Sequence, residues 1–292
     1  MNATFDQSCF GNPVNPDALI CPLCEGALTL VDRQLICPNH HSFDIARQGY
    51  VNLLPVQQKR SKHPGDSKEM VVARSKFLNS GIYQPIAQKL TELVRSLWVE
   101  NRALRLLDAG CGEGYYLDYL ARELSPRDGL DAVGMDISKE AVAAAAKRNR
   151  EISWVVGSNA RPPLTPGLDL ILCVFGFPSY EGFQPLLKPG GRIVLVEPGP
   201  DHLIELRQVI YPTVKRNPPP NLDRAEHLGF QLKDTQNLQY QVPELDQSRI
   251  QDLLQMTPHL YRATREGKEA VSRLERIRLT VDVVFRTLER QA

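Results

Sequence analysis

A glycine-rich turn between a buried strand and a helix constrains the fold of this chain more than any other feature. Residues 104–109 are largely apolar and indicate a strand, and Gly110, Gly112 and Gly114 follow directly. The helical pattern of residues 115–124 begins at once after them. Glycines in such a turn let the backbone approach a ligand at the carboxyl end of a parallel sheet. The sequence therefore predicts an α/β fold with a ligand site at this turn.

The segments that follow continue the alternation of strand and helix. Strands are expected over 132–136, 152–157, 169–175 and 191–197, the last entered by a turn at 188–191, and helices over 139–150 and 203–211. This rhythm predicts a mostly parallel sheet with helices on both faces. The pattern is less regular from Leu222, where we expect strands over 230–232, 238–242 and 279–285 and helices over 247–255 and 266–277.

Three cysteines near the start of the chain have the spacing of a metal site. Cys21 and Cys24 are followed twelve residues later by Cys37, and His40 and His41 come next. A unit this small cannot bury a sufficient core without a staple, so the pattern predicts one structural Zn²⁺. Either His41 or His40 satisfies the spacing of the fourth ligand. Four protein ligands leave no open position, which disfavours a catalytic metal.

The remaining three cysteines are not expected to bind the metal. Cys9 lies in a polar leader, whereas Cys111 and Cys173 are most simply small buried residues.

Charge is balanced overall but biased locally. The chain has 35 Lys and Arg against 34 Asp and Glu, which argues against a uniformly basic nucleic-acid binder. Residues 46–76, however, contain seven basic residues and two acids. This stretch is either a solvated connector or a contact surface for RNA phosphates. We expect a zinc-binding domain over 1–48 with a polar leader, a basic linker over 49–76 and a larger domain over 77–292.

The chain shows no pattern for membrane insertion or export. No apolar run reaches the length needed to span a bilayer, and the polar start lacks a signal-peptide pattern. We therefore expect a soluble, cytoplasmic protein without a membrane partner.

The glycine turn differs from the dinucleotide-binding fingerprint. That fingerprint requires its third glycine one position after Gly114, where Tyr115 stands. An acid two residues before the first glycine, here Asp108, is typical of class I S-adenosylmethionine-dependent methyltransferases, because a carboxylate suits the ammonium group of that cofactor. Asp136, at the end of the next strand, is expected to bind the ribose hydroxyls, with a helix N-cap or a surface acid as the alternative. Ser158 and Asn159 are expected at the adenine edge.

Three segments together resemble the bacterial 23S rRNA guanine-N1 methyltransferases (RlmA-like). They are residues 21–24 with 36–44, residues 49–57 with 59–61 and 64–67, and residues 107–116. The middle segment is the most specific, because generic methyltransferases lack it. The resemblance implies a class I Rossmann-like methyltransferase domain with a small zinc-binding domain. It also implies S-adenosylmethionine-dependent methylation of guanine N1 in a hairpin loop of 23S rRNA domain II, by a homodimer.

The resemblance also assigns residues. It implies Cys21, Cys24, Cys37 and His41 as zinc ligands, and Tyr83, Gly112, Glu113 and His202 as cofactor contacts, beside the glycine loop of Gly110 and Gly114. Residues 174–178 depart from the family pattern, and the leader through Ile20 is extra. Phe175, Phe177 and Tyr180 near this departure could stack on the target base or pack in the core. No general base is identified, so the catalytic residue stays unassigned.

Two alternatives compete with this hypothesis. The first is a small-molecule methyltransferase acting on a quinone or phenol, for which a zinc unit and a basic linker have no use. The second is a zinc-dependent RNA-binding protein with a non-catalytic methyltransferase fold, against which the intact glycine loop argues.

Overall fold

An eight-stranded sheet forms the centre of the molecule. The computed structural model describes residues 14–58, 61, 64–98, 102–124, 129–257 and 263–291. In the described chain the strand order is β10-β13-β9-β8-β5-β6-β7-β4. Strands β4 to β9 of this sheet run parallel, and β13 runs antiparallel to both β9 and β10. The bounds are β4 (Tyr50–Asn52), β5 (Leu104–Ala109), β6 (Leu130–Asp136), β7 (Ser153–Val156), β8 (Leu168–Val174), β9 (Leu187–Pro198), β10 (Phe230–Gln241) and β13 (Thr280–Arg290).

Helices cover both faces of this sheet, as predicted. Leu106 and Leu170 point to one face, where they join a core built with α1, α2, α3, α4, α6, α8 and α10. Leu107 and Ile171 point to the other face, where the core includes α5, α7 and the start of the chain. The bounds are α1 (Lys68–Asn79), α2 (Gln84–Leu97), α3 (Tyr115–Glu123), α4 (Lys139–Arg148), α5 (Tyr180–Phe183), α6 (Ile204–Ile210), α7 (Asp223–His227), α8 (Gln247–Met256) and α10 (Arg265–Ser272). None of these described helices has the length and apolar character needed to cross a bilayer.

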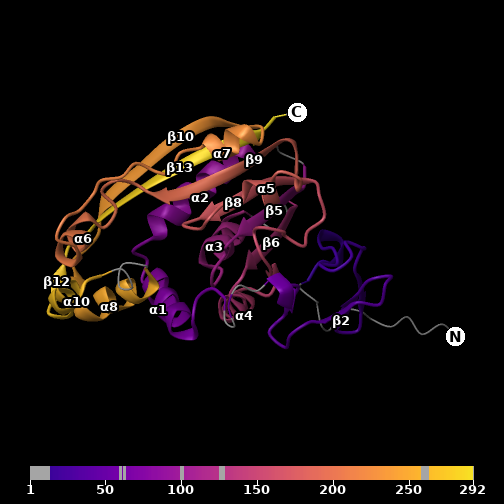
Figure 1. The fold of residues 1–292 in the computed structure, drawn as a ribbon, viewed down its shortest axis with the longest axis horizontal. Helices are drawn as coiled ribbons and strands as arrows, with labels where there is room; N and C mark the ends of the chain where they lie inside the picture. Colours follow the sequence, from indigo (N-terminus) through magenta and orange to yellow (C-terminus); the bar gives the residue numbers. More distant parts are fainter. Residues whose placement is uncertain are drawn as a thin grey trace.

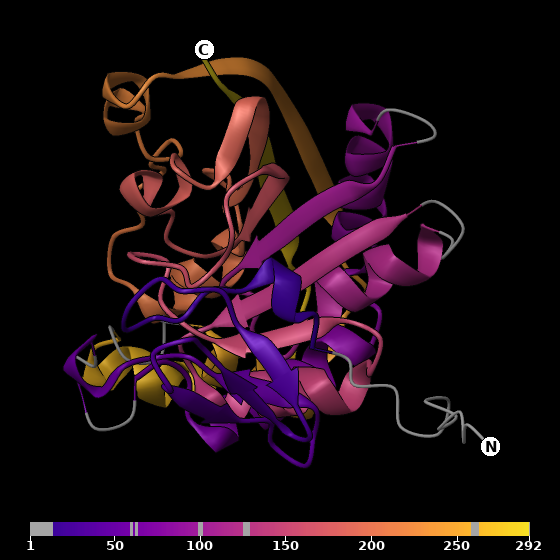
Figure 2. The same cartoon turned by 90° about the vertical axis from the view of Figure 1, so that its right-hand side faces the viewer.

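Two smaller units lie at opposite ends of the molecule (Figure 1). We call residues 21–45 the cysteine unit. It holds the antiparallel strands β1 (Thr29–Val31), β2 (Gln34–Ile36) and β3 (Ser42–Asp44). At the other end, α6, α8 and α10 gather beside the short pair β11 (Leu245–Asp246) and β12 (Arg276–Ile277). Figure 2 looks onto the cysteine unit, with the sheet behind it.

Residues 14–20, the described part of the leader, attach the cysteine unit to the sheet. They include the short 3-10 helix η1 (Pro16–Ala18). The backbone N–H of Ile20 donates to Pro163 O (3.1 Å), and that of Thr165 donates to Ala18 O (3.0 Å). Asn15 also donates from its backbone to Ser153 Oγ (2.8 Å).

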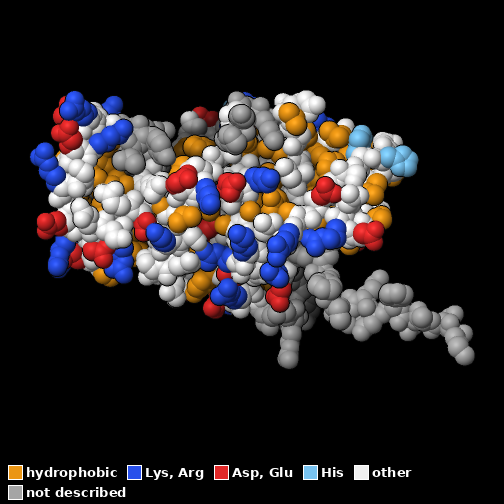
Figure 3. Space-filling view, turned by 90° about the horizontal axis from the view of Figure 1, so that it is seen from below, with side chains coloured by type: hydrophobic (Ala, Val, Ile, Leu, Met, Phe, Trp, Pro, Cys, Tyr) orange, Lys and Arg blue, Asp and Glu red, His pale blue; other side chains and the backbone are white. Residues whose placement is uncertain are grey.

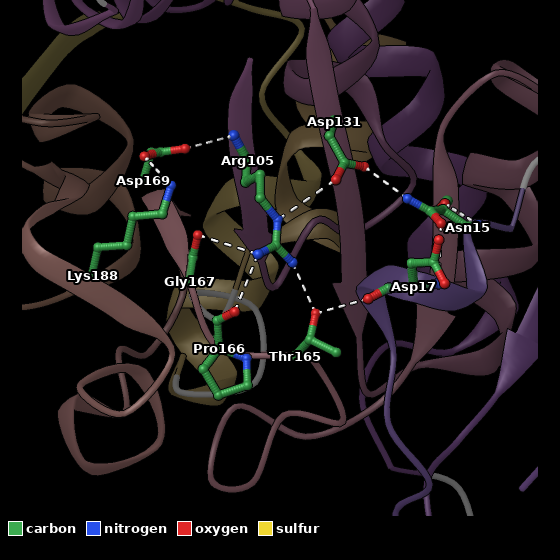
Figure 4. A network of polar contacts seen from close by, with 10 residues as sticks. Asn15, Asp17, Arg105, Asp131, Thr165, Pro166, Gly167, Asp169 and Lys188 are labelled. Carbon is green, nitrogen blue, oxygen red and sulfur yellow. Dashed lines mark hydrogen bonds and ion pairs between the residues drawn. The ribbon is translucent and has the colours of Figure 1, made fainter. Parts of the chain in front are cut away.

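Arg105 completes this attachment from the sheet side (Figure 4). Its guanidinium donates to Thr165 Oγ1 (2.8 Å) and to two carbonyls, and it pairs with Asp131 (3.7 Å). Asn15 Nδ2 donates to the same Asp131 carboxylate (3.3 Å). The leader is therefore tied to three separate strands or loops of the larger domain.

The structure differs from the sequence prediction at several places. Residues 230–241 form one continuous strand rather than two, because β10 pairs along β13 on both sides of an irregularity at Lys233 despite its polar middle. The helix expected to reach 277 ends at Ser272, and β12 follows. The residues expected as a turn at 188–191 lie within β9. The predicted linker contains β4, η2 (Val56–Gln58) and the start of α1, while its Lys59, Arg60 and Lys62 lie outside the described residues, as does Cys9.

Candidate active site and metal centre

The glycine loop after β5 requires its glycines. Gly110, Gly112 and Gly114 have φ of 91°, 57° and 82°, in the left-handed region that favours glycine. At Gly114 a Cβ would also lie 2.6 Å from Trp154 and 2.9 Å from Ala145. The loop is therefore shaped by backbone conformation at all three positions and by close helix packing at Gly114.

Asp136 holds this loop from the neighbouring strand. Its two carboxylate oxygens accept from the backbone N–H of Gly112 (3.0 Å) and of Ser138 (2.8 Å). Ser138, and not Asp136, caps α4, since its Oγ accepts from Ala141 N (3.2 Å). Burial is the main reason why the pKa of Asp136 is raised. The carboxylate thus lies at the carboxyl end of β6, where the predicted ribose contact requires it.

Asp108 is buried beneath the same loop. It is 1% exposed, and among the described residues its Oδ1 has no hydrogen-bond partner. Burial, with the nearby charges of Asp136 and Glu113, raises the pKa of Asp108 to about 7. A buried acceptor without a partner is costly unless a ligand supplies a donor. The ammonium group of S-adenosylmethionine fits this position chemically.

Glu113 is held by an arginine on α4. It is 2% exposed, and its Oε1 accepts from Arg148 Nη2 (3.4 Å). Arg148 Nε also donates to the Glu113 carbonyl (3.2 Å). Burial raises the pKa of Glu113, although the Arg148 charge opposes that shift.

Tyr83 and His202, distant in sequence, are brought together beside Phe175. His202 Nδ1 accepts from the backbone N–H of Asp282 (3.3 Å), which leaves Nε2 to donate to Tyr83 Oη (3.2 Å). The Phe175 ring lies 5.8 Å from His202 and 6.1 Å from Tyr83, between ring centroids. Tyr116 of α3 also contacts Phe175, at 6.3 Å. This aromatic group forms one wall at the carboxyl ends of β8 and β9.

The two residues predicted at the adenine edge follow β7. Asn159 Nδ2 donates to Phe177 O (3.3 Å) and lies 4.0 Å from where a Cβ on Gly110 would be. The Ser158 hydroxyl accepts from Ala160 N (3.3 Å). Asn159 therefore faces the glycine loop, whereas the Ser158 side chain is engaged in its own turn.

The three aromatic residues named near β8 have different environments. Phe175 belongs to the aromatic wall, and Tyr180 packs on Phe230 with ring centroids 6.0 Å apart in the core. Phe177, in contrast, is 90% exposed. Of these three, Phe177 is the one left open to solvent. Cys111 and Cys173 are buried, as the sequence predicts.

The cysteine unit brings four metal-binding side chains together. The donor atoms of Cys21, Cys24, Cys37 and His41 all lie within 4.8 Å of one another. His41 Nδ1 is 3.4 Å from both Cys21 Sγ and Cys37 Sγ, and Cys24 Sγ is 3.6 Å from Cys37 Sγ. These separations suit four ligands on one tetrahedral ion. The cluster contains His41 rather than His40.

The surroundings of Cys24 favour the thiolate form of its side chain. Hydrogen bonds from the Gly26 backbone and the Asn39 side chain lower the pKa of Cys24 to about 6. A thiolate is the form that binds Zn²⁺. The three thiols and one imidazole form a closed structural site with no open position.

Comparison with known proteins agrees with this geometry. Over 269 residues the chain is 32% identical to a Bacillus subtilis protein provisionally named a 23S rRNA (guanine-N1-)-methyltransferase, covering 90% of this chain and 94% of that protein. The chain belongs to the 23S rRNA guanine-N1-methyltransferase family. A Streptomyces fradiae 23S rRNA (guanine(748)-N1)-methyltransferase is 35% identical over 190 residues, 64% of this chain and 66% of that one. A provisionally named Micromonospora griseorubida relative is 35% identical over 217 residues, 66% of this chain and 70% of that one.

Family models match both units of this methyltransferase. Residues 19–62 match the zinc ribbon described as "RlmA, N-terminal", and residues 106–191 match "Methyltransferase domain". Its two sites thus bind S-adenosylmethionine and one structural Zn²⁺.

Two residues of the methyltransferase site were missed by sequence reasoning, which counted them only as charges of the linker. Arg74 of α1 lies against the glycine loop, with Nη1 3.4 Å from where a Cβ on Gly112 would be. Asp66 pairs with Arg74, and its carbonyl accepts from Ser138 Oγ (2.8 Å). The segment 64–67, which carried part of the family resemblance, could have pointed to Asp66, whereas Arg74 lies outside it.

Proposed function

We propose that the protein transfers the methyl group of S-adenosylmethionine to N1 of a guanine in a hairpin loop of 23S rRNA domain II. The observation that carries this proposal is the buried Asp108 carboxylate below the glycine loop, whose Oδ1 has no hydrogen-bond partner among the described residues. It supports a site for a cationic cofactor in a chain that belongs to the family of these enzymes. The two alternative functions are disfavoured by that membership and by the zinc ribbon match.

The geometry of the site supports the following roles for the cofactor residues. Asp108 accepts from the cofactor ammonium, and Asp136 accepts from the ribose hydroxyls. Asn159, with the backbone around Ser158, contacts the adenine edge. Tyr83, Glu113 and His202 complete the pocket, with Gly110, Gly112 and Gly114 letting the ligand lie against the backbone.

The protein contributes mainly alignment to the reaction. The bound cofactor supplies an electrophilic methyl group on its sulfonium. The chain must hold guanine N1 in line with that group and exclude other nucleophiles. The N1 proton leaves to an acceptor that we do not assign to a residue, because the carboxylates of the site described here hold the loop or face the cofactor.

Phe177 is the best-placed residue to receive the target base. It follows β8 at the carboxyl edge of the sheet, and its carbonyl is fixed by Asn159. A ring that is 90% exposed offers a stacking surface to a base taken out of its helix.

The RNA backbone is proposed to lie along the face that carries α1 and α4. Lys and Arg side chains gather over the central part of this face (Figure 3). The exposed basic residues of these helices and their ends are Lys68, Lys76, Lys139, Lys147 and Arg150. The zinc ribbon at one end would extend the contact. By analogy with its family, we propose that the enzyme works in the cytoplasm as a homodimer.

Methyl transfer to RNA tests this function. Purified protein is incubated with tritiated S-adenosylmethionine and an unmodified 23S rRNA domain II transcript, and the modified base is mapped by a block to reverse transcription. We expect label at N1 of one hairpin guanine and none with Asp108→Asn. Label on small metabolites alone would contradict the proposal.

A further inference from the structure

Arg74 occupies a position in the cofactor site that no role yet explains. It comes from α1, which lies beside α8 (Figure 1), and its side chain is 24% exposed. Nη2 donates to the Met256 carbonyl at the end of α8 (3.3 Å), and Nη1 pairs with Asp66. The guanidinium is thereby held over Gly112 by groups from two separate segments of the chain, Asp66 before α1 and Met256 of α8.

The carboxylates of the site complement only part of the proposed cofactor. A cationic side chain is needed for the rest. Asp66, Asp108, Glu113 and Asp136 all bring carboxylates to the glycine loop or its neighbour. The ammonium, sulfonium and ribose hydroxyls of the cofactor suit such groups. Its amino-acid part, however, also carries a carboxylate, which acids repel and a guanidinium binds through paired hydrogen bonds.

Two described arginines act electrostatically on these acids, Arg74 and Arg148. Arg148 already uses most of its N–H donors within the protein. Besides its bonds to Glu113, it donates to Asn79 Oδ1 (3.0 Å) and Ser75 Oγ (3.2 Å), and it stacks over Tyr115 with Cζ 5.7 Å from the ring centre.

Arg74 makes fewer hydrogen bonds than Arg148. Among the described residues its partners are the Asp66 carboxylate and one carbonyl, so donors of the guanidinium remain available. Its Nη1 also lies against the glycine loop, 3.4 Å from where a Cβ on Gly112 would be.

We propose that Arg74 binds the carboxylate of the cofactor's amino-acid moiety, and that Asp66 holds its guanidinium in place. This role rests on the cofactor of the proposed function. It makes the segment 64–74, which connects the zinc ribbon to the larger domain, part of the cofactor site.

Two ligands that differ in the amino-acid part test this role by calorimetry. S-adenosylhomocysteine contains the carboxylate, whereas 5′-methylthioadenosine keeps the adenine, ribose and sulfur but lacks it. Loss of a charge-assisted hydrogen bond in Arg74→Ala is expected to weaken S-adenosylhomocysteine binding roughly 10- to 100-fold. Binding of 5′-methylthioadenosine should stay within about twofold, which also shows that the variant is folded. Arg74→Lys should recover part of the lost affinity, because lysine keeps the positive charge but lacks the paired N–H donors of the guanidinium.

Lys76→Ala provides the matched control, since Lys76 is an exposed cation on the same helix. It should change neither affinity. Equal weakening of both ligands in Arg74→Ala, or no weakening of either, would overturn the role of Arg74. A wild-type protein that binds neither ligand would instead contradict the proposed function itself.

Discussion

The Asp108 carboxyl group links cofactor binding to pH. Its pKa is raised to about 7, mainly by burial. The ammonium group of the ligand binds the ionised form, so affinity for S-adenosylhomocysteine should rise with pH and be about tenfold weaker at pH 6 than at pH 8. Calorimetry at pH 6, 7 and 8 measures this, and Asp108→Asn should show weak binding without the pH dependence. A wild-type affinity that does not change across this range would contradict a titrating Asp108.

The same residue sets an opposite trend in stability without ligand. Its folded pKa lies above the unfolded value of 3.8, so its stabilising contribution is present below pH 4 and is lost as pH rises through 7. At pH 8 the ligand-free Asp108→Asn variant should therefore be more stable than wild type, by ~1–3 kcal/mol. Urea unfolding at pH 5 and pH 8 provides the comparison.

Gly114 carries both a backbone and a packing constraint. Ala at this position would adopt φ of 82° and place its Cβ 2.6 Å from Trp154, so we expect Gly114→Ala to cost ~2–4 kcal/mol of unfolding free energy. Gly190 has φ of 76° with nothing within 4 Å of its Cβ position. Gly190→Ala should therefore cost only about 1 kcal/mol. If thermal unfolding gave the same loss of stability for Gly114→Ala and Gly190→Ala, the Trp154 side chain would have to move to make room for the added Cβ.

Phe177 should matter for RNA and not for stability. Because the side chain is 90% exposed, Phe177→Ala should leave the melting temperature and S-adenosylhomocysteine affinity unchanged. Loss of one stacked base should lower kcat/KM for the RNA roughly 5- to 100-fold, and Phe177→Tyr should retain most of the activity. An unchanged kcat/KM in Phe177→Ala would place the target base elsewhere.

At the scale of elements, local signals predicted the centre of the fold. Strand β5 has the predicted bounds, Leu104–Ala109, because an apolar run next to glycines is a local pattern. The middle of β10 contains Lys233 and Asp234, which favour a loop by themselves. Its strand form depends on pairing with β13, which lies far along the chain. The short pair β11–β12 is likewise defined only by tertiary contact.

The same distinction applies to the candidate site. The three metal-binding cysteines and the glycine loop have fixed spacing in sequence and were predicted from it, whereas spacing left His40 and His41 open and the family resemblance selected His41. His202 was identified only through the family resemblance, because its position depends on a hydrogen bond from Asp282 on β13. Arg74 and Asp66 were missed, since only the folded chain brings α1 next to Gly112.

Metal removal should loosen the cysteine unit and leave the main sheet intact. With chelator, or in Cys24→Ser, hydrogen exchange over residues 21–45 should increase at least tenfold, because few apolar contacts hold these short strands. Strands β5, β6 and β8 should keep their protection, since both faces are covered by the core. Cys111→Ser is the matched control, a buried thiol outside the cluster. Protection of 21–45 that survives chelation would show that the leader alone stabilises the unit.

At the scale of the whole molecule, the basic face should govern affinity for RNA. Replacing Lys139 and Lys147 of α4 by Glu should weaken RNA binding and reduce the salt dependence, by a log–log slope of about 1 for each RNA phosphate that the variant no longer neutralises. Lys89→Glu on α2, away from this face, serves as the control. Filter binding between 50 and 200 mM salt gives the slopes. Equal slopes for the α4 variant and wild type would exclude this face as the RNA contact surface.

The position of β13 also determines when the enzyme can become complete. This strand is synthesised after β9 and β10 but lies between them in the sheet. Until it is inserted, both neighbours have an open edge, and His202 lacks the Asp282 N–H that orients its ring. A nascent chain in which β13 has not yet been made therefore has no finished cofactor wall. An enzyme that modifies ribosomal RNA would in this way gain its activity only after β13 has been translated.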